Sequence, residues 1–450
     1  TLAALALLQA QSAPAPVAVR EVHRQFLALG EATKDRIWPG FDAPRYVREA
    51  ADAEAGDVLR FSSDLSVADP NVFMTVGADY LGSHSAEENL GLLFHEAFHA
   101  FEGDAHRPGA KWGAENASLL FEYSDSTPRN DALFSIECRL LLAALEAGEA
   151  DGKRAEARRF LAVRGLRQAE LEPRFVQFEK GLESNEGLAE YAGFHAVALA
   201  ADLVSEGKLS LPIVRRTGEA FLAATLRPLG EIGETGKNAR RRFYFTGAAQ
   251  GFLLDRLAPD WKKEVQEKAI ATQDLLAKAL GPGEFEEASA AALEEAGYAK
   301  ALRVAMEGTA TRKEAARALR DSVLGKGGLR IVVEAPGGGF LRSFDPMNVV
   351  LVEGGVRVHT RMLQIGGPSN LTASFERPLV QETREGRYTT VLDPTEGATV
   401  SVGGSPIDLS KPGEHRGGKV TVEGPGVRVE ADAGLVRVEK DRVLVRAGTL

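Results

Sequence analysis

The chain has 450 residues, of which 44% are hydrophobic, so it is long enough to form more than one domain with a packed core. Its net charge of −10 at pH 7 and pI of about 5.5 give no electrostatic attraction to nucleic acid or to an anionic membrane, and neither is expected as its main partner. Because Cys138 is the only cysteine, no intrachain disulfide can form.

The N-terminal residues form a short apolar run, Leu2–Leu8, followed by small residues and prolines. This pattern resembles the end of a secretory signal peptide, so residues 1–16 are interpreted as its remnant and the chain is expected to be exported to the periplasm, the cell surface or the medium. The alternative is a frayed or docked N-terminal helix. No run of 18 or more apolar residues follows, so no transmembrane segment is expected.

Residues from about Val17 to Glu54 carry helical signals, which Trp38-Pro39-Gly40 interrupts. Asp57–Phe61 and Asn71–Val76 are rich in strand-forming residues and predict two strands. The fold class expected for the first part of the chain is therefore mainly α-helical with a small N-terminal sheet.

The next segment, Ser85–Gly103, predicts one amphipathic helix. Ser85 and Glu88 form a capping-box pattern at its start, and Gly103 is a typical end. Its apolar residues share one face because they recur at helical spacing: Leu90, Leu93, Phe94, Ala97, Phe98 and Phe101.

This helix carries His95, Glu96 and His99 in an H-E-x-x-H pattern. Two imidazoles four residues apart lie on one face of a helix, close enough to bind one metal ion, and the Glu is placed as general base for a zinc-bound water. A buried group of this kind without a metal would leave polar atoms unpaired. The alternative is a coincidental trio on a helix surface. With one cysteine in the chain, Zn²⁺ ligands are expected among histidines and carboxylates.

Two further helices are predicted after this motif. Asp131–Gly148 is apolar enough to lie in the core, with Glu137 as an unexpected acid within it. Lys153–Leu182 is highly charged and is expected to present a solvated face.

Glu183–Ala200 predicts a buried helix for which Ser184 or Asn185 supplies the N-cap. Glu186 and Glu190 lie one turn apart on it among apolar neighbours. Carboxylates in such surroundings need a charged or metal partner.

A zinc ion bound by two histidines lacks one protein ligand, and His₂Glu sites take it from a carboxylate. Glu186 is the predicted third ligand, and Glu190 is predicted to hold a histidine ring or another ligand in place. Glu137 and Glu183 are competing ligands, and an exposed surface pair of Glu186 with Glu190 is the alternative.

Arg240–Leu257 predicts a helix with a basic start and an apolar remainder. A phenol at Tyr244 can donate a hydrogen bond to an oxyanion, although a tyrosine in the core with a satisfied hydroxyl is the competing interpretation. Trp261–Leu280 and Glu284–Leu324 predict further scaffold helices, separated by Gly281-Pro282-Gly283.

Helical periodicity ends near Gly325, and short β-rich runs separated by Gly/Pro turns fill the remainder. Their spacing predicts a separate all-β C-terminal domain over 329–450, a sandwich or a barrel, after a first domain over 17–325. His359 and His415 lie in no ligand-like cluster, and the Gly-rich pieces lack the context of a phosphate loop.

Three strings, HEAFH at 95–99, NEGLAEY at 185–191 and YFTG at 244–247, together resemble the gluzincin class of zinc metallopeptidases and, more distantly, its aminopeptidase branch. The resemblance implies a zincin-like catalytic domain in which His95, His99 and Glu186 bind zinc. It also implies Glu96 as base and Tyr244 as oxyanion partner. A strand upstream of the metal helix often lines the substrate cleft in such enzymes, so Asn71–Val76 either has this role or is an ordinary strand.

Two departures from the aminopeptidase branch leave endo- and exo-cleavage open. Glu186 follows His99 by 87 positions, which is longer than usual there, and no G-x-M-E-N string is present. The function expected is zinc-dependent hydrolysis of a peptide or protein substrate. The alternative is a non-catalytic secreted binding protein with a structural metal site and a β-rich ligand- or protein-binding domain.

Overall fold

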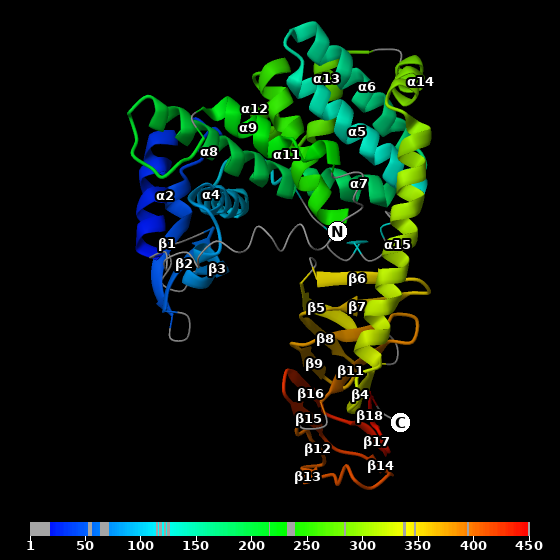
Figure 1. The fold of residues 1–450 in the computed structure, drawn as a ribbon. Coiled ribbons are helices and arrows are strands. Elements are labelled where there is room, and N and C mark those ends of the chain that lie inside the picture. The colour runs from blue at the N-terminus through cyan, green and yellow to red at the C-terminus, as the bar shows by residue number, and fades with distance from the viewer. Residues whose placement is uncertain are drawn as a thin grey trace. The chain divides into compact units, whose positions relative to one another are not determined.

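The computed structural model describes residues 19–448 except for 53–55, 64–71, 114–115, 117–118, 121–122, 124–126, 216, 232–238, 283–284, 336–338, 346–347 and 394–395. The apolar run Leu2–Leu8 and the predicted signal-peptide remnant lie outside these residues. The chain divides into two compact units, residues 1–306 and 307–450, with the division inside one long helix (Figure 1). In the described part of the chain, no helix combines the length and the apolar character needed to cross a membrane.

The first unit is mainly helical, with one small sheet near its start (Figure 1). Its helices are α2 (Val19–Thr33), η1 (Ala43–Tyr46), α3 (Ala78–Gly82), α4 (Ala86–Gly103), α5 (Pro128–Glu146), α6 (Ala150–Gln168), α7 (Pro173–Leu182), η3 (Glu183–Gly187), α8 (Leu188–Ser205), α9 (Gly218–Leu226), α11 (Ala239–Leu257), α12 (Trp261–Lys268), α13 (Thr272–Leu280), α14 (Phe285–Glu295) and the start of α15 (Tyr298–Leu324).

The sheet of the first unit is antiparallel with strand order β1-β2-β3, formed by β1 (Val47–Asp52), β2 (Gly56–Ser62) and β3 (Val72–Gly77). The two predicted strands are confirmed as β2 and β3. The helical interpretation of residues 47–52 is wrong, because their backbone groups pair with β2 and not with one another. Strand formation here depends on pairing with the next strand along the chain and on packing, and the helical signals of residues 17–54 do not report either.

Helix α4 is the predicted metal-motif helix, and its capping is confirmed. Ser85 is the N-cap, and the reciprocal hydrogen bonds of a capping box join it to Glu88. Each apolar residue of its predicted face is buried in the core of the unit. Because one face is fixed against the core, the orientation of the two histidines about the helix axis is fixed as well.

The segment around Glu186 is not the start of a new helix. Helices α7, η3 and α8 follow one another without a break, and η3 is a π-helical turn (Glu183–Gly187). Ser184 and Asn185 therefore do not act as N-caps, which corrects the prediction, because the backbone N–H groups of this turn belong to a continuous helix. Single π-helical turns within helices are frequent at functional sites.

The charged stretch Lys153–Leu182 also differs from the prediction of one solvated helix. Pro173 begins a second helix, so the stretch is divided into α6 and α7. Arg164 and Arg167 of α6 are buried and bind the buried carboxylates of Glu137 and Glu179. Opposite charges from three helices thus neutralise one another inside the core, which helical spacing alone does not reveal.

The second unit contains two sheets and the end of α15 (Figure 1). The eight-stranded sheet has the order β14-β17-β18-β4-β11-β10-β7-β6, and the seven-stranded sheet has the order β13-β12-β15-β16-β9-β8-β5. The strands are β4 (Leu329–Glu334), β5 (Phe340–Phe344), β6 (Val349–Val352), β7 (Val356–His359), β8 (Leu363–Gly367), β9 (Leu371–Phe375), β10 (Leu379–Glu382), β11 (Arg387–Leu392), β12 (Thr399–Val402), β13 (Ser405–Pro406), β14 (Gly413–Arg416), β15 (Val420–Gly424), β16 (Val427–Ala431), β17 (Gly434–Glu439) and β18 (Arg442–Ala447).

The inner faces of these two sheets share one apolar core, to which strands of both sheets contribute residues such as Ile331, Val436, Ile365 and Phe375. The predicted all-β region is therefore a two-sheet sandwich. Ala316 and Val323 of α15 form a smaller cluster with valines of the eight-stranded sheet. His359 is buried in β7, and His415 lies in the edge strand β14.

Candidate metal centre

His95 and His99 project from successive turns of α4 toward one point. Their Nε2 atoms lie 3.1 Å apart, and the two rings meet almost at right angles, with an interplanar angle of 77°. His95 is 5% exposed and His99 is partly buried. Spacing of four residues on a helix accounts for this approach, because one turn places the second side chain directly above the first.

Glu186 of η3 completes a group of three. One of its oxygens, Oε2, lies 3.4 Å from Nε2 of His95 and 3.4 Å from Nε2 of His99. These three residues can hold a metal ion, and the group has no fourth His, Cys, Asp or Glu among the residues that the structure describes. Burial alone would raise the pKa of the Glu186 carboxyl, but its contacts with both imidazoles hold that pKa far below its usual value.

A second carboxylate lies behind each histidine. Oε2 of Glu190 is 2.9 Å from Nδ1 of His95, and Oε2 of Glu102 is 3.8 Å from Nδ1 of His99. A carboxylate at Nδ1 favours the tautomer that carries its proton there, which leaves Nε2 as a ligand atom. Glu190, which the sequence predicted to hold a histidine ring or another ligand in place, thus contacts His95. Glu102 was missed, although its position three residues after His99 was a usable signal.

The protonation of the metal-free group follows from these contacts. Burial lowers the pKa of each histidine, but carboxylate contacts outweigh it and raise the pKa to about 10 for His95, chiefly through Glu186 and Glu190. For His99 the contacts with Glu102 and Glu186 raise the pKa to about 9. Since a metal ligand must be the neutral imidazole, metal binding to this group must displace protons.

Tyr244 and Arg240 of α11 lie against the same group. The Tyr244 ring is stacked on His95 with centroids 5.7 Å apart and an interplanar angle of 13°. Arg240 donates one hydrogen bond to the Tyr244 hydroxyl oxygen and another to Oε1 of Glu186. The sequence predicted Tyr244 as a site residue or a core tyrosine, and the structure places it beside the histidines. Arg240 was missed.

Close backbone contacts bring these helices together. A Cβ atom on Gly187 of η3 would lie 2.6 Å from Cα of Gly247 in α11, so the two backbones are in direct contact. A Cβ on Gly193 of α8 would likewise lie 2.5 Å from the carbonyl oxygen of Gly91 in α4. Only glycine permits such approaches, and they fix the distance of Glu186 from both α4 and α11.

Two of the candidate ligands are excluded by their partners. Glu183 accepts two hydrogen bonds from Arg164, at 2.8 and 2.9 Å, and a third from Thr246 of α11. Glu137 accepts from Arg164 and Arg167. These carboxylates serve the buried ion-pair network and anchor η3 to α6 and α11.

Glu96 lies between the two histidines on α4 and is partly exposed. Its negative charge acts on the His95 ring. The same charge helps to raise the pKa of the Tyr80 phenol in α3, for which burial is the largest cause and Glu96 the second. Tyr80 is 45% exposed. Glu96 thus places a partly exposed negative charge near His95 and Tyr80.

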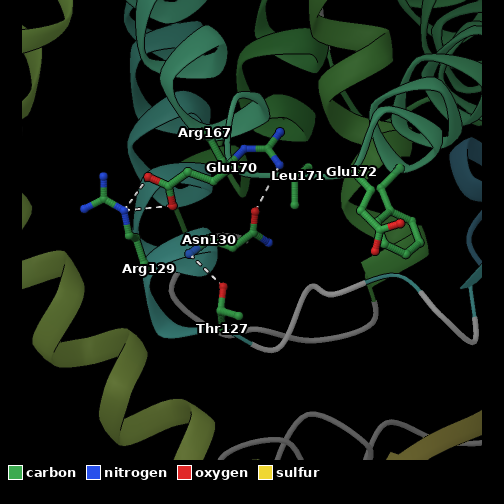
Figure 2. Close-up of a pocket in the computed structure, with 8 residues that line it drawn as sticks. Thr127, Arg129, Asn130, Arg167, Glu170, Leu171 and Glu172 are labelled. Carbon is green, nitrogen blue, oxygen red and sulfur yellow. Dashed lines mark hydrogen bonds and ion pairs between the residues drawn. The ribbon is translucent and has the colours of Figure 1, made fainter.

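A cavity of about 390 Å³ lies elsewhere, at the N-terminus of α5 (Figure 2). Its lining includes Asn130, Arg167 and Glu170, whose side chains are engaged by hydrogen bonds with neighbouring groups. It shares no lining residue with the metal group.

Comparison with known proteins adds no further assignment, because no family model, no curated protein and no solved structure matches the chain.

Proposed function

We propose that this protein is a zinc-dependent peptidase whose ion is held by His95, His99 and Glu186. One observation carries the proposal: the three ligand atoms are separated by 3.1, 3.4 and 3.4 Å. Zinc bonds of about 2.0–2.2 Å at tetrahedral angles separate neighbouring ligand atoms by about 3.3–3.6 Å. The spacing of the side chains therefore fits a small tetrahedral ion.

The composition of the group favours catalysis over a structural role. A structural zinc site is closed by four protein ligands, whereas a catalytic site keeps a position for water or substrate. Three ligands are present among the described residues, and a carboxylate that could serve as a base is part of the same helix turn. A non-catalytic binding protein with a structural ion is the alternative, and it requires neither feature.

Each side chain near the metal group has a role in this proposal. Zinc, when bound, supplies Lewis-acid polarisation of water and of the scissile carbonyl. Glu96 accepts the proton of the attacking water and returns it to the leaving amine. Tyr244, stacked on His95, donates a hydrogen bond to the developing oxyanion. Glu190 and Glu102 hold the two imidazoles in the orientation that presents Nε2.

The test is cleavage of an unstructured protein such as casein, with and without a chelator, by the wild type and by Glu96→Gln. We expect zinc to be retained and hydrolysis to fall by about 10²–10⁴-fold in the variant, since one general base is removed. Glu88→Gln is the matched control, because Glu88 is an exposed acid on the same helix and glutamine also serves in a capping box.

Wild-type rates in Glu96→Gln would remove this residue from the chemistry. Zinc-loaded wild-type protein that cleaves none of a varied set of peptides and proteins would contradict the peptidase proposal and favour the binding protein.

A further inference from the structure

We propose that Arg240 is a positioning residue with two tasks: it restricts Glu186 to one-oxygen coordination of the metal, and it orients the Tyr244 hydroxyl. The second task rests on the proposed function, whereas the first requires only that the group binds a metal ion.

The first task follows from the different partners of the two oxygen atoms of the Glu186 carboxylate. Its Oε2 faces both histidine Nε2 atoms at 3.4 Å, while its Oε1 accepts a hydrogen bond of 2.5 Å from the Arg240 guanidinium. The Glu186 and Arg240 side chains are only 8% and 12% exposed, so water weakens this charge-assisted contact little. An oxygen held in this way is withdrawn from the metal, which keeps a coordination position open for other ligands.

The second task follows from the chemistry of the guanidinium group. Arginine has donors and no acceptor, so the Tyr244 oxygen must be the acceptor in its contact with Arg240. The hydroxyl proton of Tyr244 is therefore directed away from Arg240. Arg240 precedes Tyr244 by one helical turn of α11, and its guanidinium carbon lies 5.3 Å from the centroid of the Tyr244 ring.

One side chain thus joins the metal ligand on η3 to the tyrosine on α11. The two elements are in backbone contact at Gly187 and Gly247, so the distance that Arg240 bridges is fixed by packing. A planar group with two donor arms can hold both oxygens at once, whereas the ammonium group of lysine is a compact point charge.

The experiment compares Arg240→Gln with Arg241→Gln, which removes the same charge from an exposed neighbour on the same helix. Zinc affinity is measured by competition with a chromogenic chelator, and coordination is monitored by the visible absorption of the Co²⁺-substituted protein. We expect Arg240→Gln to lower zinc affinity by about 10–100-fold and to change the Co²⁺ spectrum, because a group that orients a ligand is lost. Arg241→Gln should leave both unchanged.

Tyr244→Phe separates the two tasks. It should lower kcat and leave zinc affinity unchanged, and its effect on kcat should not add to that of Arg240→Gln, because Arg240 acts on turnover partly through Tyr244. Arg240→Lys, which keeps the charge, provides a second variant if Arg240→Gln does not fold. We expect its zinc affinity to lie below that of the wild type.

Wild-type zinc affinity and an unchanged Co²⁺ spectrum in folded Arg240→Gln or Arg240→Lys would overturn the first task. Fully additive losses of kcat in the double variant would overturn the second. Because the metal measurements need no substrate, a protein that never cleaves peptides but loses zinc affinity on Arg240→Gln would refute the peptidase proposal and leave the first task supported.

Discussion

Gly187→Ala tests whether backbone contact between η3 and α11 sets the geometry of the metal group. The added Cβ would lie 2.6 Å from Cα of Gly247 and 3.0 Å from the carbonyl oxygen of Phe243, whereas ordinary contact begins at 3.4 Å. The two backbones must therefore separate by roughly 0.8 Å along this contact, since a close-packed interior offers little room.

This displacement is large for a metal ligand. The preceding residue, Glu186, supplies the third ligand atom, and metal–ligand distances tolerate only about ±0.2 Å. We expect Gly187→Ala to lower zinc affinity by at least about 10–100-fold, the range found when a ligand loses its support. Overpacking should also lower the free energy of unfolding by about 1–3 kcal/mol.

The assay is chelator competition for zinc together with urea unfolding of the metal-free protein. Gly165→Ala is the control, because Gly165 is exposed on α6 and its added Cβ would meet no atom within 4 Å. It should bind zinc normally and gain about 0.5–1 kcal/mol of stability. A folded Gly187→Ala protein with wild-type zinc affinity would refute the reasoning, since the ligand would then tolerate the shift.

Three further predictions follow from other parts of the structure. Glu190→Ala should lower zinc affinity about 10–100-fold with little loss of stability, because His95 loses its Nδ1 partner; equal affinity by chelator competition would count against this role. Glu179→Leu should lower the free energy of unfolding by about 3–5 kcal/mol in urea, since it breaks a buried ion pair with Arg167; a loss below about 1 kcal/mol would contradict this. Burial lowers the pKa of His359 from 6.5 to about 4. As the pH falls from 6.5 to 4, the unfolded chain binds a proton at this ring that the folded protein does not, so the free energy of unfolding falls by about 3 kcal/mol. The difference in the free energy of unfolding between wild type and His359→Gln should therefore shrink over this range, and a difference independent of pH would refute the lowered pKa of His359.

The sequence was enough to predict the local features of the candidate site. The capping box, the apolar face of α4 and the spacing of His95 and His99 are all set by residues within one helix, so a short window contains the information. The change from helical to strand-forming sequence patterns near residue 325 could also be predicted, because a strand pattern is contained within a few residues.

The remaining features needed the tertiary structure. Helical signals suggested a cap at Ser184 or Asn185, whereas packing makes that segment a π-helical turn within a continuous helix. Glu137 and Glu183 competed with Glu186 on sequence grounds, and only the position of Arg164 shows that they are paired elsewhere.

The sequence by itself determined which helix carries the two imidazoles, which residues flank it, and that an all-β region follows. The tertiary structure alone decided which distant acid meets these imidazoles, that Arg240 holds its second oxygen, and that paired glycines set the distance between the helices. The physical reason is that helical periodicity is encoded over a few residues, whereas contacts across 87 positions depend on how whole helices pack.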